Sequence, residues 1–217
     1  LLSSYYPNRY QKDKKDLKES FTYYMKRSGK TWDKKDGRPI IHYSQQKEGE
    51  RPGRHSEHIE IDDFKAYLEL IEGPRDIMLE VKDKNRSFLS CNQVINPDKR
   101  VLEDQWAKYK YLVLLKDHKN YLAIRELLKD ERPDVLAFYR LIEKSAKKKA
   151  ETKNLINGYS HVWGYFKDQA SSREKETYQA YLDQMDIKKA LKFLERLEKK
   201  YPSTYLSKSY LFRPGAY

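Results

Sequence analysis

Cysteine is almost absent from this chain of 217 residues, in which Cys91 is the only one. A lone thiol excludes a fold held by internal disulfides and is typical of a reducing compartment, so we expect a cytoplasmic protein. Long apolar stretches are also missing, since no run approaches the ~18 residues of a transmembrane helix. Residues 1–7 lack the basic and apolar segments of a signal peptide. We therefore expect no membrane association.

Hydrophobic residues are scarce as well: they make up 38% of the sequence, 36% of the residues are charged, and the mean hydropathy is -1.01. Aromatic residues nevertheless reach 13%, with 19 Tyr. Disordered chains are poor in aromatic residues, so we predict a folded protein with a heavily charged surface. The chain also lacks an initiator methionine, and we interpret it as a piece of a longer protein.

The positive charge of the chain is unevenly distributed. Of the net charge of +12, residues 1–98 contribute +2 and residues 99–217 contribute +10. Such an excess attracts polyanions, of which nucleic acid is the commonest. A solvated, lysine-rich helical surface is the alternative interpretation. Membrane-surface binding is less favoured, because the basic residues are mixed with acidic ones rather than segregated on one helix face.

Two domains are predicted from the hydrophobic pattern. The first 97 residues alternate between helices (12–28, 62–72 and 82–94) and strands (38–44 and 75–81). This order is typical of βα units in a parallel sheet. After Asn96-Pro97 only helical periodicity remains, in segments 101–117, 119–129, 134–149, 151–168, 172–184 and 187–200, with Ser171 or Ser172 as a capping residue for the fifth. We predict an α/β domain over residues 1–97 and an all-α domain over residues 98–217, ending in an irregular aromatic tail.

The candidate chemistry lies at the predicted strand ends. His42 ends the first strand, His55 follows the next loop, and Glu80 lies near the end of the second strand. Ligands and catalytic groups gather where parallel strands end. Imidazole and carboxylate are suitable ligands for Zn²⁺ or Mn²⁺, and a carboxylate within an apolar strand needs a cation or a hydrogen-bond donor. These three residues are our candidate metal ligands.

Simpler interpretations of the same residues remain open. Glu80 can pair with Lys82 or Arg54 without any metal. His58, in the segment His-Ser-Glu-His, fits an exposed loop residue.

Four segments occur in one order at compact spacing: Thr31-Trp32, Pro39–Ser44, Arg54–Ile59 and Asp76–Lys84. Together they resemble the last third of the UV-damage endonuclease family, over residues 30–95. The resemblance implies the C-terminal βα units of a TIM-type barrel. It also implies a cluster of divalent ions, usually Mn²⁺, with Zn²⁺ or Mg²⁺ as alternatives, that cuts DNA on the 5′ side of a UV lesion. The metal ligands of that family correspond to His42, His55 and Glu80.

Further roles follow from this resemblance. Lys82 is expected to orient Glu80 or to offset phosphate charge, and four residues are expected to contact lesion-bearing double-stranded DNA: Tyr43, Ser44, Arg51 and Arg54. We expect a monomer. The sequence also departs from the family: Ile40 stands where a lysine is common, and the ligands on earlier barrel strands are absent. Activity is therefore expected to need upstream residues.

The second half resembles the YbgA-type helical domain, which has no settled role. The resemblance is carried by Trp106–Lys110, Asn120-Tyr121, His161–Lys167 and Glu174-Lys175. We expect Gly164 and the neighbouring aromatic residues to serve packing rather than base stacking. The alternative function for the whole chain is a basic helical module that binds nucleic acid or protein, attached to a non-catalytic barrel remnant.

Overall fold

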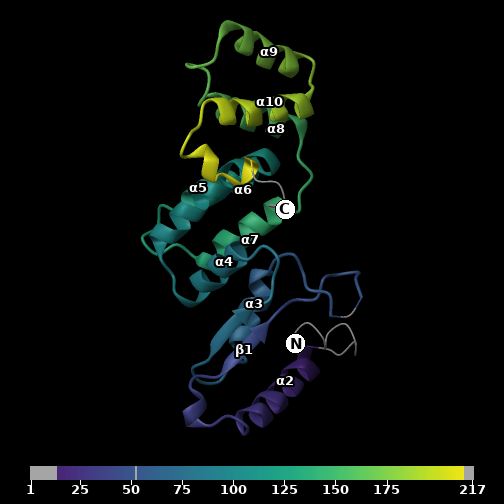
Figure 1. Cartoon of the computed structure of the whole chain (residues 1–217), viewed down its shortest axis with the longest axis vertical. Coiled ribbons are helices and arrows are strands. Elements are labelled where there is room, and N and C mark those ends of the chain that lie inside the picture. The colour runs from purple at the N-terminus through teal and green to yellow at the C-terminus, as the bar shows by residue number, and fades with distance from the viewer. Residues whose placement is uncertain (1–13, 52, 213–217) are drawn as a thin grey trace. The chain divides into compact units, whose positions relative to one another are not determined.

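A computed structural model describes residues 14–51 and 53–212 (Figure 1). Within these residues the chain forms nine α-helices, three short 3₁₀ helices and one two-stranded sheet. It divides into two compact units, Leu1–Pro97 and Asp98–Tyr217. Each unit is described by itself below. No helix in the described part of the chain combines the length and the apolarity needed to span a membrane.

Some expectations fall outside the described residues. They concern the N-terminal residues 1–7, the first two residues of the predicted helix 12–28, and the last five residues of the aromatic tail.

The first unit contains a parallel pair of strands. β1 (Ile40–Tyr43) pairs with β2 (Asp76–Leu79), with His42 opposite Met78. Helix α3 (Ile61–Leu68) lies between them in sequence, as expected for a βαβ unit. The parallel pairing confirms this part of the α/β prediction, whereas two strands do not form a closed barrel, and no TIM-type barrel is seen in the described residues.

The helices of this unit are α2 (Lys14–Gly29), α3 and α4 (Asn85–Ile95), with the short η1 (Lys34–Asp36) before β1. The predicted helix 62–72 was too long at its C-terminal end. The amide of Leu70 donates to the carbonyl of Tyr67 at 3.0 Å, which is a tighter turn than an α-helix makes. Gly73, with φ of +73°, then reverses the chain toward β2.

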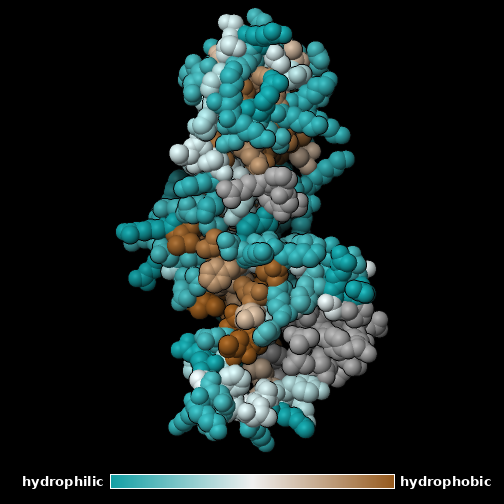
Figure 2. Space-filling model, in the orientation of Figure 1, coloured by the Kyte–Doolittle hydropathy of each residue, from teal (hydrophilic) through white to brown (hydrophobic). Residues whose placement is uncertain are grey.

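One face of the sheet is buried and the other is exposed. The buried face packs on a cluster formed by Tyr43, Ile59, Phe64, Tyr67 and Cys91. On the opposite face, Ile40 and Met78 are 52% and 49% exposed, and they share this face with His42. Figure 2 shows hydrophobic surface in the part of the view where Figure 1 draws the sheet. The candidate ligand His42 therefore lies on an uncovered, partly apolar face.

The second unit is helical, as predicted. Its helices are α5 (Lys99–Lys116), α6 (His118–Leu127), α7 (Val135–Ala146), α8 (Thr152–Trp163), α9 (Ser172–Asp183) and α10 (Ile187–Lys200). α5 contacts α6, α7 and α8 and contributes buried Leu102, Val113 and Leu114 to the core. α8 approaches α5 closely at Gly158, where a Cβ atom would lie 2.5 Å from the Cδ2 atom of Leu115.

Helix starts in the second unit follow the capping chemistry of the sequence. Ser171, one of the two predicted capping residues, accepts a hydrogen bond from the Glu174 amide and completes a capping box with it. The aromatic tail is more ordered than predicted. It forms η2 (Leu206–Lys208) and η3 (Tyr210–Phe212), which contact α5 and bury Leu206 and Tyr210.

Candidate metal centre

The parallel sheet brings His42 and Glu80 together. The Nδ1 atom of His42 lies 2.7 Å from the Oε1 atom of Glu80, a hydrogen-bond distance. Glu80 follows β2 directly, and its amide donates to the carbonyl of Tyr43 at 2.8 Å, which continues the strand pairing past the last residue of β2. The two side chains are 47% and 30% exposed, so they remain accessible to a ligand.

His55 approaches the other oxygen of the same carboxylate. Its Nε2 atom lies 3.6 Å from the Oε2 atom of Glu80. The loop that carries His55 folds back on itself through an antiparallel bridge between Gln46 and His55. The Gln46 side chain organises the loop interior, because its amide nitrogen donates to three loop carbonyls and its oxygen accepts from the Gly53 amide. Local hydrogen bonds thus place His55 at the base of a hairpin beside β1.

The environment of Glu80 favours its charged form. The hydrogen bond from His42 lowers the pKa of the Glu80 carboxyl below its ordinary value, and the charge of His55 adds to this effect against the opposing effect of burial. A carboxylate that stays ionised between two imidazoles is a suitable donor set for a divalent ion. The donor chemistry of the three residues therefore fits the predicted ion.

The three side chains do not form a metal-binding group in their present positions. As the side chains stand, no group of three or more His, Cys, Asp or Glu residues in the described part of the chain is arranged to hold a metal ion. Glu80 instead contacts both imidazoles directly. The simpler interpretation, in which Glu80 pairs with Lys82 or Arg54, is wrong. Lys82 pairs with Glu57 instead, and the Nε atom of Arg54 lies 3.8 Å from the Oε2 atom of Glu50.

Glu57 is a residue of this region that the sequence analysis missed. Its Oε1 atom accepts hydrogen bonds from Lys82 Nζ at 2.9 Å and from Lys47 Nζ at 3.2 Å. These bonds lower the pKa of the Glu57 carboxyl. Glu57 thereby links the hairpin that carries His55 to the segment that follows Glu80. Its position two residues after His55 was the only available signal, and its partners are distant in sequence.

The four expected DNA contacts differ in accessibility. Tyr43 and Ser44 are each 1% exposed. The Tyr43 ring packs edge-on against Phe64, with centroids 5.3 Å apart, on the face of the sheet opposite His42. Neither side chain is available to DNA here, which corrects the expectation from their position next to His42. Arg51 and Arg54 are exposed on the hairpin.

His58 is not simply an exposed loop residue. Its Nε2 atom lies 3.0 Å from Glu60 Oε1, and its side chain is 41% exposed. His58 thus belongs to a separate pair and is not part of the group around Glu80.

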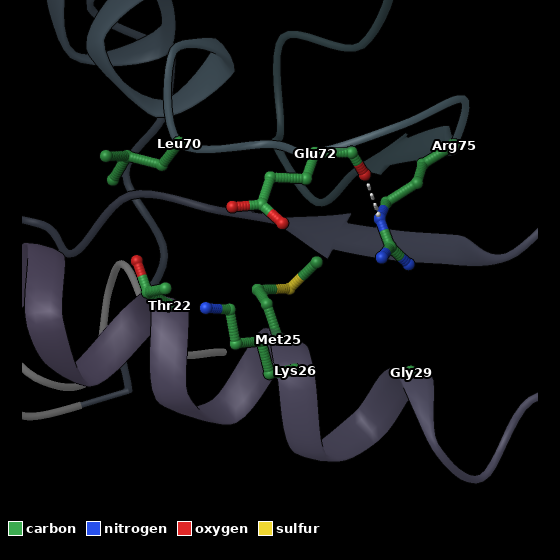
Figure 3. Close-up of a pocket in the computed structure, with 7 residues that line it drawn as sticks. All are labelled: Thr22, Met25, Lys26, Gly29, Leu70, Glu72 and Arg75. Carbon is green, nitrogen blue, oxygen red and sulfur yellow. Dashed lines mark hydrogen bonds between the residues drawn. The ribbon is translucent and has the colours of Figure 1, made fainter.

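A small pocket lies elsewhere in the first unit, between α2 and the segment that leads into β2 (Figure 3). Its volume is about 110 Å³, and it is lined by Thr22, Met25, Lys26, Gly29, Leu70, Glu72 and Arg75. Ligand pockets usually enclose about 300–1,000 Å³, so this one is too small for a nucleotide. None of the candidate metal ligands lines it.

Comparison with known proteins finds similarity in both units. Residues 110–215 match a family described as protein of unknown function, DUF1722, which corresponds to the expected YbgA-like domain. The chain is also 31% identical over 180 residues to a protein named UV DNA damage endonuclease from Clostridium perfringens (strain 13 / Type A). The aligned residues make up 79% of this chain and 42% of that relative, so the chain spans less than half of its length.

The extent of this alignment matters for the first unit. An alignment of 180 residues is longer than the whole second unit, Asp98–Tyr217, and therefore extends into the first. No solved structure matches the chain.

Proposed function

We propose that this chain is part of a metal-dependent DNA-repair endonuclease that nicks the DNA backbone on the 5′ side of UV photoproducts. The observation that carries the proposal is the approach of two imidazoles, His42 and His55, to the two oxygens of Glu80. Similarity to a protein named UV DNA damage endonuclease supports the reaction class. The substrate of this reaction is double-stranded DNA that carries a lesion.

The exposed face of the sheet is an argument for further strands that would cover it. Ile40 and Met78 lie uncovered beside His42, and within the described residues neither β1 nor β2 has a second strand partner. In a closed barrel, inward-facing residues are covered by the other strands. We propose that β1 and β2 belong to a TIM-type barrel and that their exposed face is its interior. The remaining metal ligands then come from strands contributed by further residues.

His42, His55 and Glu80 would hold one side of the metal cluster, with Mn²⁺ as the preferred ion. When bound, divalent ions supply activation of water and stabilisation of the charge that develops on the phosphate oxygens. The chain's own residues would then position the substrate. Arg51 and Arg54 lie exposed on the hairpin, where guanidinium groups can contact phosphates. Lys82 donates a hydrogen bond to Glu57 and not to Glu80, so its role would be to hold Glu57 rather than to orient Glu80.

The test uses a protein that contains this chain together with its upstream strands. Nicking of UV-irradiated plasmid and stoichiometric Mn²⁺ binding are measured for that protein and for a His55→Ala variant. We expect the variant to lose nicking and to bind less Mn²⁺. His58→Ala is the matched control, since His58 pairs with Glu60 outside the group around Glu80, and it should retain both properties. Nicking by the His55→Ala variant at the parental rate would rule out the proposed site.

A further inference from the structure

A cluster of cationic and aromatic side chains lies in the helical unit. Lys110 Nζ lies 5.0 Å from the ring centroid of Tyr111 and 5.6 Å from that of Tyr205. The guanidinium carbon of Arg125 lies 5.7 Å from the centroid of Tyr121. With Tyr165, described below, these residues form what we call the Lys110–Arg125 cluster, and they come from α5, α6 and the segments after α8 and α10.

The two cations of this cluster contact aromatic rings. In the part of the chain that the structure describes, neither Lys110 nor Arg125 forms a salt bridge, and their contacts are with rings. Burial lowers the pKa of the Lys110 ammonium, and the positive charge of Arg125 lowers it further. Removing a cation from water without a counter-charge is unfavourable. A bound anion would offset the free-energy cost of burying the Lys110 ammonium and would reduce its repulsion from Arg125.

A flat aromatic surface lies next to these cations. The rings of Tyr165 and Tyr205 are nearly parallel, with an interplanar angle of 10° and centroids 5.9 Å apart. The Tyr111 hydroxyl donates to the Tyr165 hydroxyl at 3.0 Å, which fixes the orientation of Tyr165. Tyr111 is only 2% exposed, whereas Tyr165 is 36% exposed. The cluster thus presents one supported, accessible ring, and the exposure of Tyr165 departs from the expectation that the aromatic residues beside Gly164 serve packing alone.

We propose that the Lys110–Arg125 cluster binds a nucleotide of single-stranded DNA, with its phosphate held by Lys110 and Arg125 and its base stacked on Tyr165. A nucleotide joins an anionic phosphate to a flat base, so its phosphate matches the two cations and its base matches the Tyr165 ring. Bases in a duplex already stack on each other, so an aromatic platform selects unpaired bases. The charge of +10 over residues 99–217 attracts any nucleic acid strand to this unit. The site differs from the candidate metal centre and does not depend on the proposed endonuclease activity.

The first test measures binding of the full chain to a short fluorescent oligothymidylate by anisotropy at low salt. Lys110→Gln and Arg125→Gln should each weaken binding by about tenfold, because each removes a charged hydrogen-bond donor to phosphate. The slope of log affinity against log salt should fall by about 0.7 for each removed contact. Lys129→Gln is the matched control, since it removes the same charge from a 71% exposed side chain paired with Glu126. Equal weakening by all three substitutions would show diffuse attraction only and overturn the proposal.

The second test separates stacking from charge. Tyr165→Leu should weaken binding by about tenfold, because stacking of one base on an aromatic ring is lost. Tyr165→Phe retains the ring but loses the hydrogen bond from Tyr111, so binding should weaken by less than in Tyr165→Leu. Equal losses in both variants would contradict a stacked base. Melting curves show whether each variant folds.

Competition experiments identify the ligand class. A single strand should bind more tightly than a duplex of the same sequence, and it should resist displacement by inorganic phosphate and by an acidic peptide. Tighter binding of the duplex would overturn the proposal, and so would ready displacement of the single strand by phosphate or by the peptide. Photo-crosslinking of a bromodeoxyuridine strand to the unmodified chain provides a readout that no misfolded variant can affect. Crosslinks to Tyr165 or Tyr205 support the site, and crosslinks confined to other residues contradict it.

Discussion

Nδ1 of His42 lies 2.7 Å from Oε1 of Glu80, although the residues are 38 positions apart in the sequence. Parallel pairing produces this contact. His42 lies in β1, Glu80 follows β2, and neighbouring strands are separated by only about 4.8 Å. Residues near the ends of the two strands on one face therefore meet. His55 reaches the same carboxylate from the adjoining hairpin.

The carboxylate charge of Glu80 is expected to be required for metal binding. Glu80→Gln preserves the shape of the side chain but removes the negative charge between the two imidazoles. On a protein that carries the proposed additional strands, we expect Mn²⁺ affinity to fall by more than about tenfold, measured by titration calorimetry. Glu60→Gln makes the same exchange at a carboxylate that contacts His58 and should leave the affinity unchanged. An unaltered affinity in Glu80→Gln would exclude Glu80 from the site.

Glu57 is expected to hold the hairpin in place. Glu57→Gln weakens the bonds to Lys82 and Lys47. Since these are exposed ion pairs, which water and salt screen, the free energy of unfolding should change little. The effect should be local: the amides of Lys47 and Ser56, which bond across the hairpin, should exchange hydrogen faster.

Glu48 provides the control for this experiment. It lies exposed in the same hairpin, and Glu48→Gln should leave the exchange rates of both amides unchanged. Identical exchange in the Glu57 and Glu48 variants would show that Glu57 does not restrain the hairpin.

Close packing between α5 and α8 should make Gly158 intolerant of larger residues. Even a Cβ atom would lie 2.5 Å from Leu115 Cδ2, and Leu115 is only 5% exposed, so it cannot move aside into solvent. Gly158→Val should lower the free energy of unfolding by about 1–3 kcal/mol, measured by urea denaturation. Combined with Leu115→Ala, the same substitution should cost less than it does alone. Strictly additive losses would mean that the two residues do not compete for space.

Glu174 in α9 accepts hydrogen bonds from Lys200 and Tyr201 at the end of α10, and acid should weaken this contact. Hydrogen bonds from Lys200, the Ser171 amide and Tyr201 lower the pKa of Glu174 from 4.5 to about 2. A carboxyl whose pKa is lower in the folded state stabilises the fold above its unfolded pKa, and this contribution is lost as the pH falls toward the folded pKa. The stability of the parental chain should therefore drop between pH 4.5 and about 2.

Glu174→Gln should flatten this part of the pH profile, measured by thermal unfolding. Glu176→Gln, on the exposed side of the same helix, should preserve the parental pH dependence. If the profiles of the parental chain and the Glu174 variant run parallel, Glu174 does not contribute to acid sensitivity.

Local patterns in the sequence predicted much of the secondary structure. Helical periodicity indicated the helices of the second unit, and capping chemistry indicated the start of α9 at Ser171. The apolar runs around His42 and Glu80 predicted two strands, which pair in parallel. These features depend on neighbouring residues, so the sequence by itself determines them.

Only the tertiary structure decided which polar side chains meet. It buried Tyr43 behind the sheet, paired Lys82 with Glu57, and placed Lys110 and Arg125 against aromatic rings. Periodicity shows which face of an element is apolar, but it does not show which distant side chain lies opposite each polar one. That choice depends on how strands and helices pack across long sequence separations, and it is why the roles of these residues emerge only in the folded chain.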